Sequence, residues 1–186
     1  MIWMKCRSTG STDWIVMPNT SPYDYRYRMY LNSSNAIQGP STNYWANTAP
    51  TATQFRVDRS FAGGSSVPST SATMIAYLFA SVDGVSKVGS YTGNGSSNGD
   101  SQNIDCGFSN GARFVMIKDT SASSSWFVVD TARGLVSGAD KHLKFNTTAA
   151  EETDDVIDPY SLGFTVNRFA GEFNQSGRTY IFYAIA

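Results

Sequence analysis

The octet TYIFYAIA, residues 179–186, repeats the pattern of an earlier octet, TMIAYLFA, residues 73–80. Thr, Ile, Tyr and Ala occupy the same places in both octets. Both segments are short and rich in β-branched and aromatic residues, a composition typical of β-strands. Because neither segment has a polar face, we expect both to form central strands that are covered on both sides. A strand that is encoded twice indicates a duplicated unit.

Three further blocks recur in the same order, offset by roughly 110 residues. In the first block, Ile2–Lys5 leads through a polar turn to Trp14–Val16, and Val115–Lys118 leads in the same way to Trp126–Val129. In the second block Met29–Ser34 matches Leu143–Thr148, and in the third Phe55–Val57 matches Phe164–Val166. Clusters of Gly, Ser, Asn and Pro separate the apolar segments and signal turns. We therefore predict an all-β fold of two tandem, related antiparallel β-sandwich units, jelly-roll-like and packed together. Copy A spans residues 1–83 and copy B spans residues 84–186.

The two copies differ at their starts. Copy B is introduced by the lead segment GVSKVGSYTGNG, residues 84–95, whereas copy A begins directly at its first strand. We interpret copy A as a truncated unit within a longer polypeptide. The alternative is that copy A takes its missing lead from elsewhere, such as a neighbouring chain.

Composition and charge exclude several classes of function. Charged residues make up 16% of the chain, below the value of about 25% that is usual for soluble proteins. The formal net charge of −1 offers no basic surface for nucleic acid, and no apolar run is long enough to insert into a membrane. The only cysteines, Cys6 and Cys106, are too few for a disulfide framework and are interpreted as free thiols.

Four segments carry a resemblance to a known family: GVSKVGSYTGNG (84–95), GFSNGARFVMIKDTSASSSWFVVDTARG (107–134), LKFNTTAAE (143–151) and GRTYIFYAIA (177–186). They resemble an uncharacterised C-terminal β-domain of tail-fibre-like and other virion structural proteins from marine phages and cyanophages. The resemblance covers nearly all of copy B and less of copy A, so the family would be present as two tandem copies. It implies a virion setting and assembly in a host cytoplasm, without established catalytic residues.

The sequence offers few residues for catalysis. His142 is the only histidine, and the acidic run has no counterpart in copy A. The acidic run consists of Glu151, Glu152, Asp154, Asp155 and Asp158. We interpret this run as a solvated loop, and the alternative is a calcium site, since calcium takes clustered carboxylates. We therefore predict a protein that is not an enzyme and has neither a metal site nor a cofactor.

Aromatic residues gather between the second strand of copy A and Phe55. We name Tyr25, Tyr27, Tyr44 and Trp45 as candidate surface residues that bind a partner chain or a sugar ring. The alternative is that they fill the core. The roles of Lys5 and Lys118, which occupy matched positions, are left open, and one hypothesis is that they discourage pairing at a sheet edge.

These observations lead to a functional hypothesis. We expect a non-enzymatic structural and adhesion module of a phage virion, at the distal part of a tail fibre or spike that contacts the host surface. Its expected partners are other virion chains, including copies of itself in a homotrimer, and a host cell-surface glycan. The alternatives are a capsid decoration (cement) protein and, from another class, a polysaccharide depolymerase domain.

Overall fold

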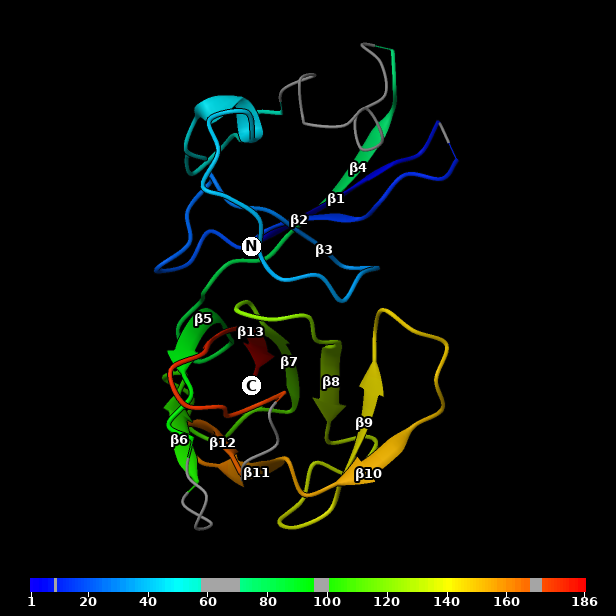
Figure 1. The fold of residues 1–186 in the computed structure, drawn as a ribbon. Coiled ribbons are helices and arrows are strands. Elements are labelled where there is room, and N and C mark those ends of the chain that lie inside the picture. The colour runs from blue at the N-terminus through cyan, green and yellow to red at the C-terminus, as the bar shows by residue number, and fades with distance from the viewer. Residues whose placement is uncertain (9, 58–70, 96–100, 168–171) are drawn as a thin grey trace. The chain divides into compact units, whose positions relative to one another are not determined.

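The computed structural model describes residues 1–8, 10–57, 71–95, 101–167 and 172–186 (Figure 1). The chain divides into two compact units, which we call unit 1 (Met1–Phe79) and unit 2 (Ala80–Ala186). In the residues that the structure describes, every regular element is an antiparallel strand except the short 3-10 turn η1 (Trp45–Asn47). The predicted all-β fold class is therefore confirmed. The packing of the two units against each other stays a prediction.

Unit 1 contains a four-stranded sheet in the order β3-β2-β1-β4. Its strands are β1 (Ile2–Cys6), β2 (Ile15–Met17), β3 (Met29–Tyr30) and β4 (Met74–Leu78). Alternate residues of β1 are buried, as expected for a strand that faces a core on one side. Tyr44 and Trp45, at the start of η1, complete that core. In the described part of unit 1, the core is thus covered by a turn and loops, where a sandwich would have a second sheet.

Unit 2 contains two sheets, with strand orders β10-β9-β8-β7-β13-β5 and β11-β12-β6. The strands are β5 (Ser86–Thr92), β6 (Gln102–Asp105), β7 (Phe114–Asp119), β8 (Trp126–Asp130), β9 (Asp140–Lys144), β10 (Glu152–Asp154), β11 (Ile157–Tyr160), β12 (Gly163–Val166) and β13 (Thr179–Ile185). Residues from both sheets share one core, where the ring of Phe164 on β12 meets that of Phe182 on β13 edge-on at 5.2 Å. Unit 2 is therefore a β-sandwich.

The sheet of unit 1 is repeated inside the larger sheet of unit 2. The order β3-β2-β1-β4 corresponds to β9-β8-β7-β13. The register also agrees: Met4 pairs with Ile15 and Ala76, and the matched Ile117 pairs with Phe127 and Phe182. A shift of one residue would exchange the two faces of a strand, so a common register means that matched residues face the same side.

One side-chain hydrogen bond occurs at the same place in both sheets. The backbone N–H of Trp14 donates to Oδ1 of Asn32 at 2.8 Å, and that of Trp126 donates to Oδ1 of Asn146 at 2.8 Å. In each case the residue before the Asn donates its own N–H to the Trp carbonyl oxygen, at 2.9 Å and 2.7 Å. The Asn side chain therefore continues the pairing between the two strands beyond the end of the backbone ladder.

The two octets end in different environments. β13 lies between β7 and β5, which confirms the central position predicted for residues 179–186. β4 is an edge strand in the part of unit 1 that the structure describes, so the central position predicted for residues 73–80 is wrong. The physical reason is that β5, formed by the lead segment of copy B, has no counterpart beside β4 among the described residues. Tyr77 and Leu78 are accordingly exposed, at 47% and 66%.

The matched lysines do not protect a sheet edge, because β1 and β7 are paired on both sides. Lys5 Nζ donates to the carbonyl oxygen of Thr12, across the turn that follows β1. Lys118 is fully buried, and its Nζ donates to the carbonyl oxygen of Asp119 at 2.7 Å. The edge-protection hypothesis for these residues is therefore wrong, and both lysines bond to backbone carbonyls near the ends of their strands.

We predict that replacing the acceptor side chain in Asn146→Ala lowers the free energy of unfolding by about 1 to 2 kcal/mol, because the N–H of Trp126 loses its partner in a largely buried setting. Urea unfolding followed by tryptophan fluorescence measures the change. Asn146→Asp keeps an acceptor oxygen and serves as the control. Equal stability of the Ala variant and the wild type would contradict the role assigned to this bond.

Candidate functional site

Two of the predicted surface aromatics are core residues. Trp45 is fully buried and Tyr44 nearly so, and the guanidinium group of Arg28 lies over the Tyr44 ring at 4.5 Å. The backbone of Trp45, Ala46 and Asn47 has positive φ angles of 50°, 53° and 46°, which turn the chain back over the sheet. The prediction that Tyr44 and Trp45 bind a ligand at the surface is therefore wrong, and the alternative, that they fill the core, holds for both.

The other two predicted aromatics are half-buried. Tyr25 packs against the core of unit 1, and the ring of Tyr27 meets that of Tyr23 edge-on at 5.0 Å. Both rings keep part of their surface accessible, but their main contacts are with neighbouring side chains of unit 1. Their role as binding residues stays a prediction.

His142, the only histidine of the chain, is a buried residue of unit 2. Its ring is buried beside Phe127 and Phe173, with centroid distances of 5.7 Å and 6.2 Å. Its Nε2 lies 3.5 Å from a carboxylate oxygen of Glu152, which also accepts a hydrogen bond from Lys144 at 2.7 Å. A catalytic histidine must reach a substrate proton, and this ring faces the core of the sandwich.

The acidic run contributes to two groups that could hold a metal ion, one of His142, Glu152 and Asp154 and one of Asp140, Asp155 and Asp158. In the second group the two carboxylate oxygens of Asp140 accept from the backbone N–H groups of Val136 and Ile157, each at 3.0 Å. Asp158 accepts from the N–H of Gly138 at 2.9 Å. Asp140 on β9 and Asp158 on β11 therefore bind the backbone of the loop that follows β8. The calcium alternative stays a prediction.

A second set of charged groups is enclosed in unit 2. Buried Asp119 accepts from Arg178 Nη1 at 2.9 Å and from two backbone N–H groups that follow it. Burial lowers the pKa of the neighbouring Lys118 ammonium group to about 8 and raises the pKa of the Tyr180 hydroxyl to about 12. Shifted pKa values often mark active sites. Here Lys118 and Asp119 are fully buried, so the set is better explained as part of the framework.

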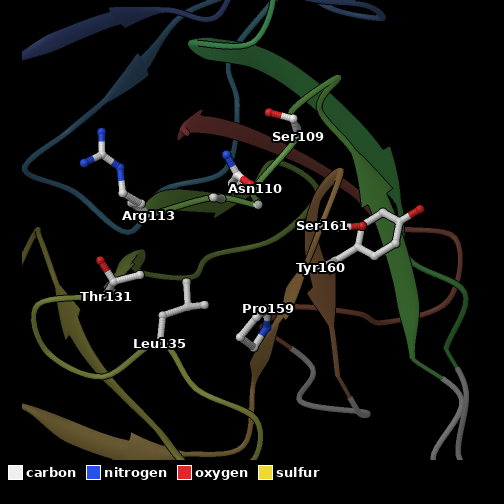
Figure 2. Close-up of a pocket in the computed structure, with 10 residues that line it drawn as sticks. Ser109, Asn110, Arg113, Thr131, Leu135, Pro159, Tyr160 and Ser161 are labelled. Carbon is white, nitrogen blue, oxygen red and sulfur yellow. The ribbon is translucent and has the colours of Figure 1, made fainter.

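The described part of unit 2 also contains an open pocket of about 350 Å³ (Figure 2). Three segments form it: the turn before β7, the loop after β8, and the turn between β11 and β12. Its lining residues are Ser109, Asn110, Gly111, Ala112, Arg113, Thr131, Leu135, Pro159, Tyr160 and Ser161. Figure 2 shows Arg113 and Asn110 coming from one segment and Pro159, Tyr160 and Ser161 from another.

Backbone hydrogen bonds hold the pocket's walls together. The N–H of Gly111 donates to the carbonyl oxygen of Ser161 at 2.7 Å, and that of Ala112 donates to Gly163 at 2.7 Å. Gly111 has a φ of 78°, and a Cβ atom there would lie 2.8 Å from the Tyr160 carbonyl oxygen. Only glycine therefore fits this close approach without a shift of the backbone. The two turns form one rigid rim.

The lining of the pocket mixes apolar and polar side chains. The lining combines a tyrosine, a proline and buried Leu135 with side-chain amide, hydroxyl and guanidinium groups. Arg113 is held in place by donating from Nε to the Ala186 carbonyl oxygen at 2.6 Å. The lining contains no Asp, Glu, His or Cys, so it lacks the usual acid, base or metal-ligand side chains. The sequence analysis did not predict this pocket, because its lining comes from segments that only the fold brings together. The one local indication was the glycine in the turn before β7, at Gly111.

A protein-family model, described as a domain of unknown function (DUF7483), matches residues 1–186. The chain belongs to the DUF7483 family. The match extends over both units of this DUF7483 chain. No curated protein and no solved structure matches it. In the residues that the structure describes, no helix is both long and apolar enough to cross a membrane.

The buried Lys118 predicts a pH dependence of stability. Its pKa is about 8 in the folded chain and 10.5 ordinarily, so between these values the unfolded chain binds more protons and stability rises with pH. We expect the wild type to gain about 2 kcal/mol relative to Lys118→Met between pH 7.5 and 9.5. Comparing the two proteins cancels other groups, such as the Cys106 thiol, whose pKa burial raises to about 12. Chemical unfolding at several pH values measures the difference, and parallel curves for the two proteins would contradict it.

Proposed function

We propose that this DUF7483 chain is a non-enzymatic structural and adhesion module of a phage virion, exposed on the particle at the distal part of a tail fibre or spike. The resemblance of its sequence motifs to virion proteins supports the setting. The duplicated sheet supports a framework role, because matched positions of the two units share strand pairing and the same hydrogen bond between a Trp backbone and an Asn side chain.

The composition of the pocket in unit 2 is the observation that carries the adhesive part of the proposal. Its lining combines amide, hydroxyl and guanidinium groups with a tyrosine and a proline, and backbone hydrogen bonds join two of its segments. Sugars combine hydroxyl groups with apolar ring faces, so they suit a lining that mixes polar groups with an aromatic ring. We therefore propose a host cell-surface glycan as the ligand, bound without being cleaved.

Several copies would strengthen a weak contact. One open pocket of this size offers few interactions, and linked copies raise the apparent affinity without any new contact. We propose a homotrimer, by analogy with other fibres, in which each chain presents the same pocket to the host surface.

The virion setting is tested by immunogold labelling of purified phage particles with antibodies raised against the whole chain. We expect label at the tail tip, with at most tens of copies per particle by quantitative mass spectrometry. Hundreds of copies spread over the head would favour a capsid decoration protein. Absence of the chain from purified particles would overturn the virion proposal.

We predict that Tyr160→Ala weakens attachment of the multivalent chain to host cells by about tenfold or more, because it removes the aromatic residue of the pocket's lining. Flow cytometry with fluorescent, multivalent protein measures attachment. Phe145→Ala removes another partly exposed aromatic side chain of unit 2 outside the pocket and should leave attachment unchanged. Equal attachment of the Tyr160→Ala variant and the wild type would contradict the proposed site. Release of reducing ends from host polysaccharide would instead indicate the depolymerase alternative.

A further inference from the structure

The outer edge of β4 is the place where the two units differ most. Its counterpart β13 pairs with β7 on one side and with β5 on the other, in a continuous register from Ile185 with Ser86 to Thr179 with Thr92. β4 pairs with β1 in the register that β13 has with β7, and no second strand pairs with it among the residues that the structure describes. Among the described residues, the sheet of unit 1 therefore matches the four central strands of the larger sheet of unit 2, and it has no counterpart of β5 beside β4.

The backbone of β4 presents its hydrogen-bonding groups outward at defined residues. Phe79 exchanges two hydrogen bonds of 2.9 Å with Met1, so it faces β1. Backbone groups alternate in direction along an antiparallel strand, so those of Met74, Ala76 and Leu78 point away from β1. The matched residues of β13 are Tyr180, Phe182 and Ala184, which pair with Tyr91, Gly89 and Lys87 of β5.

The sequence of β4 itself carries none of the residues that usually guard an edge strand. Natural edge strands are commonly guarded by charged residues, by proline or by a bulge. The strand MIAYL contains none of these residues, and Tyr77 and Leu78 are 47% and 66% exposed. An apolar, regular edge of this kind is suited to accept an added strand.

We propose that β4 accepts an extended segment of a partner polypeptide, which adds to the sheet as an antiparallel strand in the place that β5 has beside β13. Unit 2 determines the occupant's chemistry. It is a strand of about seven residues that repeats the β5 register, with its backbone bonded to Met74, Ala76 and Leu78. This inference rests on the sheet alone and does not depend on the proposed function.

The side chains of β4 indicate where the sequence of the partner strand differs from that of β5. In unit 2 the residue opposite Phe182 is Gly89, and a Cβ on Gly89 would lie 2.4 Å from the Phe182 ring. The corresponding residue of β4 is Ala76, whose side chain faces the core of unit 1 and is much smaller than that of Phe182. The added strand is therefore expected to carry a large apolar residue opposite Ala76, where β5 has glycine.

Two peptides test the proposal against the whole chain. One has the sequence of residues 84–93, GVSKVGSYTG, and the other carries Gly89→Phe in that sequence. We expect the Phe peptide to bind about tenfold more tightly or better, because it buries an aromatic ring against Ala76. The same ring would clash with Phe182, so displacement of β5 from unit 2 cannot account for its binding. Fluorescence anisotropy of labelled peptides measures both affinities.

Two variants of the chain locate the bound peptide. Ala76→Pro removes an N–H that points away from β1, and proline is tolerated at that side of an edge strand. Leu78→Lys adds a charge to the edge and retains every backbone donor. Both variants should bind the Phe peptide at least tenfold more weakly than the wild type does, with unfolding transitions like that of the wild type. If Ala76→Pro does not fold, the affinity of Leu78→Lys alone tests the location of the bound peptide.

Three results would overturn the proposal. The first is that neither peptide binds, and the second is that Leu78→Lys binds the Phe peptide as tightly as the wild type. The third is a concentration-dependent dimer of the wild type in sedimentation that Leu78→Lys abolishes, because that would assign the edge to a second copy of this chain.

Discussion

Backbone pairing on both sides of β1 and β7 is the constraint on which the rest of the structure depends. Each of these strands lies between two antiparallel neighbours in the same register, so the direction of every side chain in the matched sheets follows from it. That register puts Met4 and Ile117 in the cores and leaves the turns free to vary in length. The pocket of unit 2 lies on such turns, which fits the general pattern in which a rigid scaffold carries binding residues on its loops.

Repetition made much of the fold predictable from sequence. The pairs of Lys-ended and Trp-led strands and the two octets predicted β1, β2, β4, β7, β8 and β13, because strand patterns are local and survive changes in loops. The interpretation of the acidic run as a loop was wrong for Glu152–Asp154 and Asp158, which lie in β10 and β11. The position of β4 at an edge was not predictable from its apolar octet. The pattern of an apolar strand is the same whether or not a neighbouring strand pairs with it.

The functional residues were less predictable, for two physical reasons. Trp45 looked like a surface aromatic because it lies in a polar, loop-like segment, and only the left-handed turn at residues 45–47 turns it into the core. Tyr160 went unnoticed because its importance depends on contact between turns far apart in sequence. Lys118 is a similar case, since its burial follows from the sheet and not from any local pattern.

Both units contain one four-stranded sheet in the same register, and among the described residues the outer edge of β4 in unit 1 has no partner where β13 in unit 2 has β5. Amide hydrogen exchange of the isolated chain, followed by NMR, tests it most directly. We predict slow exchange at Phe182 and Ala184, whose N–H groups face β5, and exchange at least a hundredfold faster at the matched Ala76 and Leu78. Equal protection of the matched amides in the isolated chain would contradict the account.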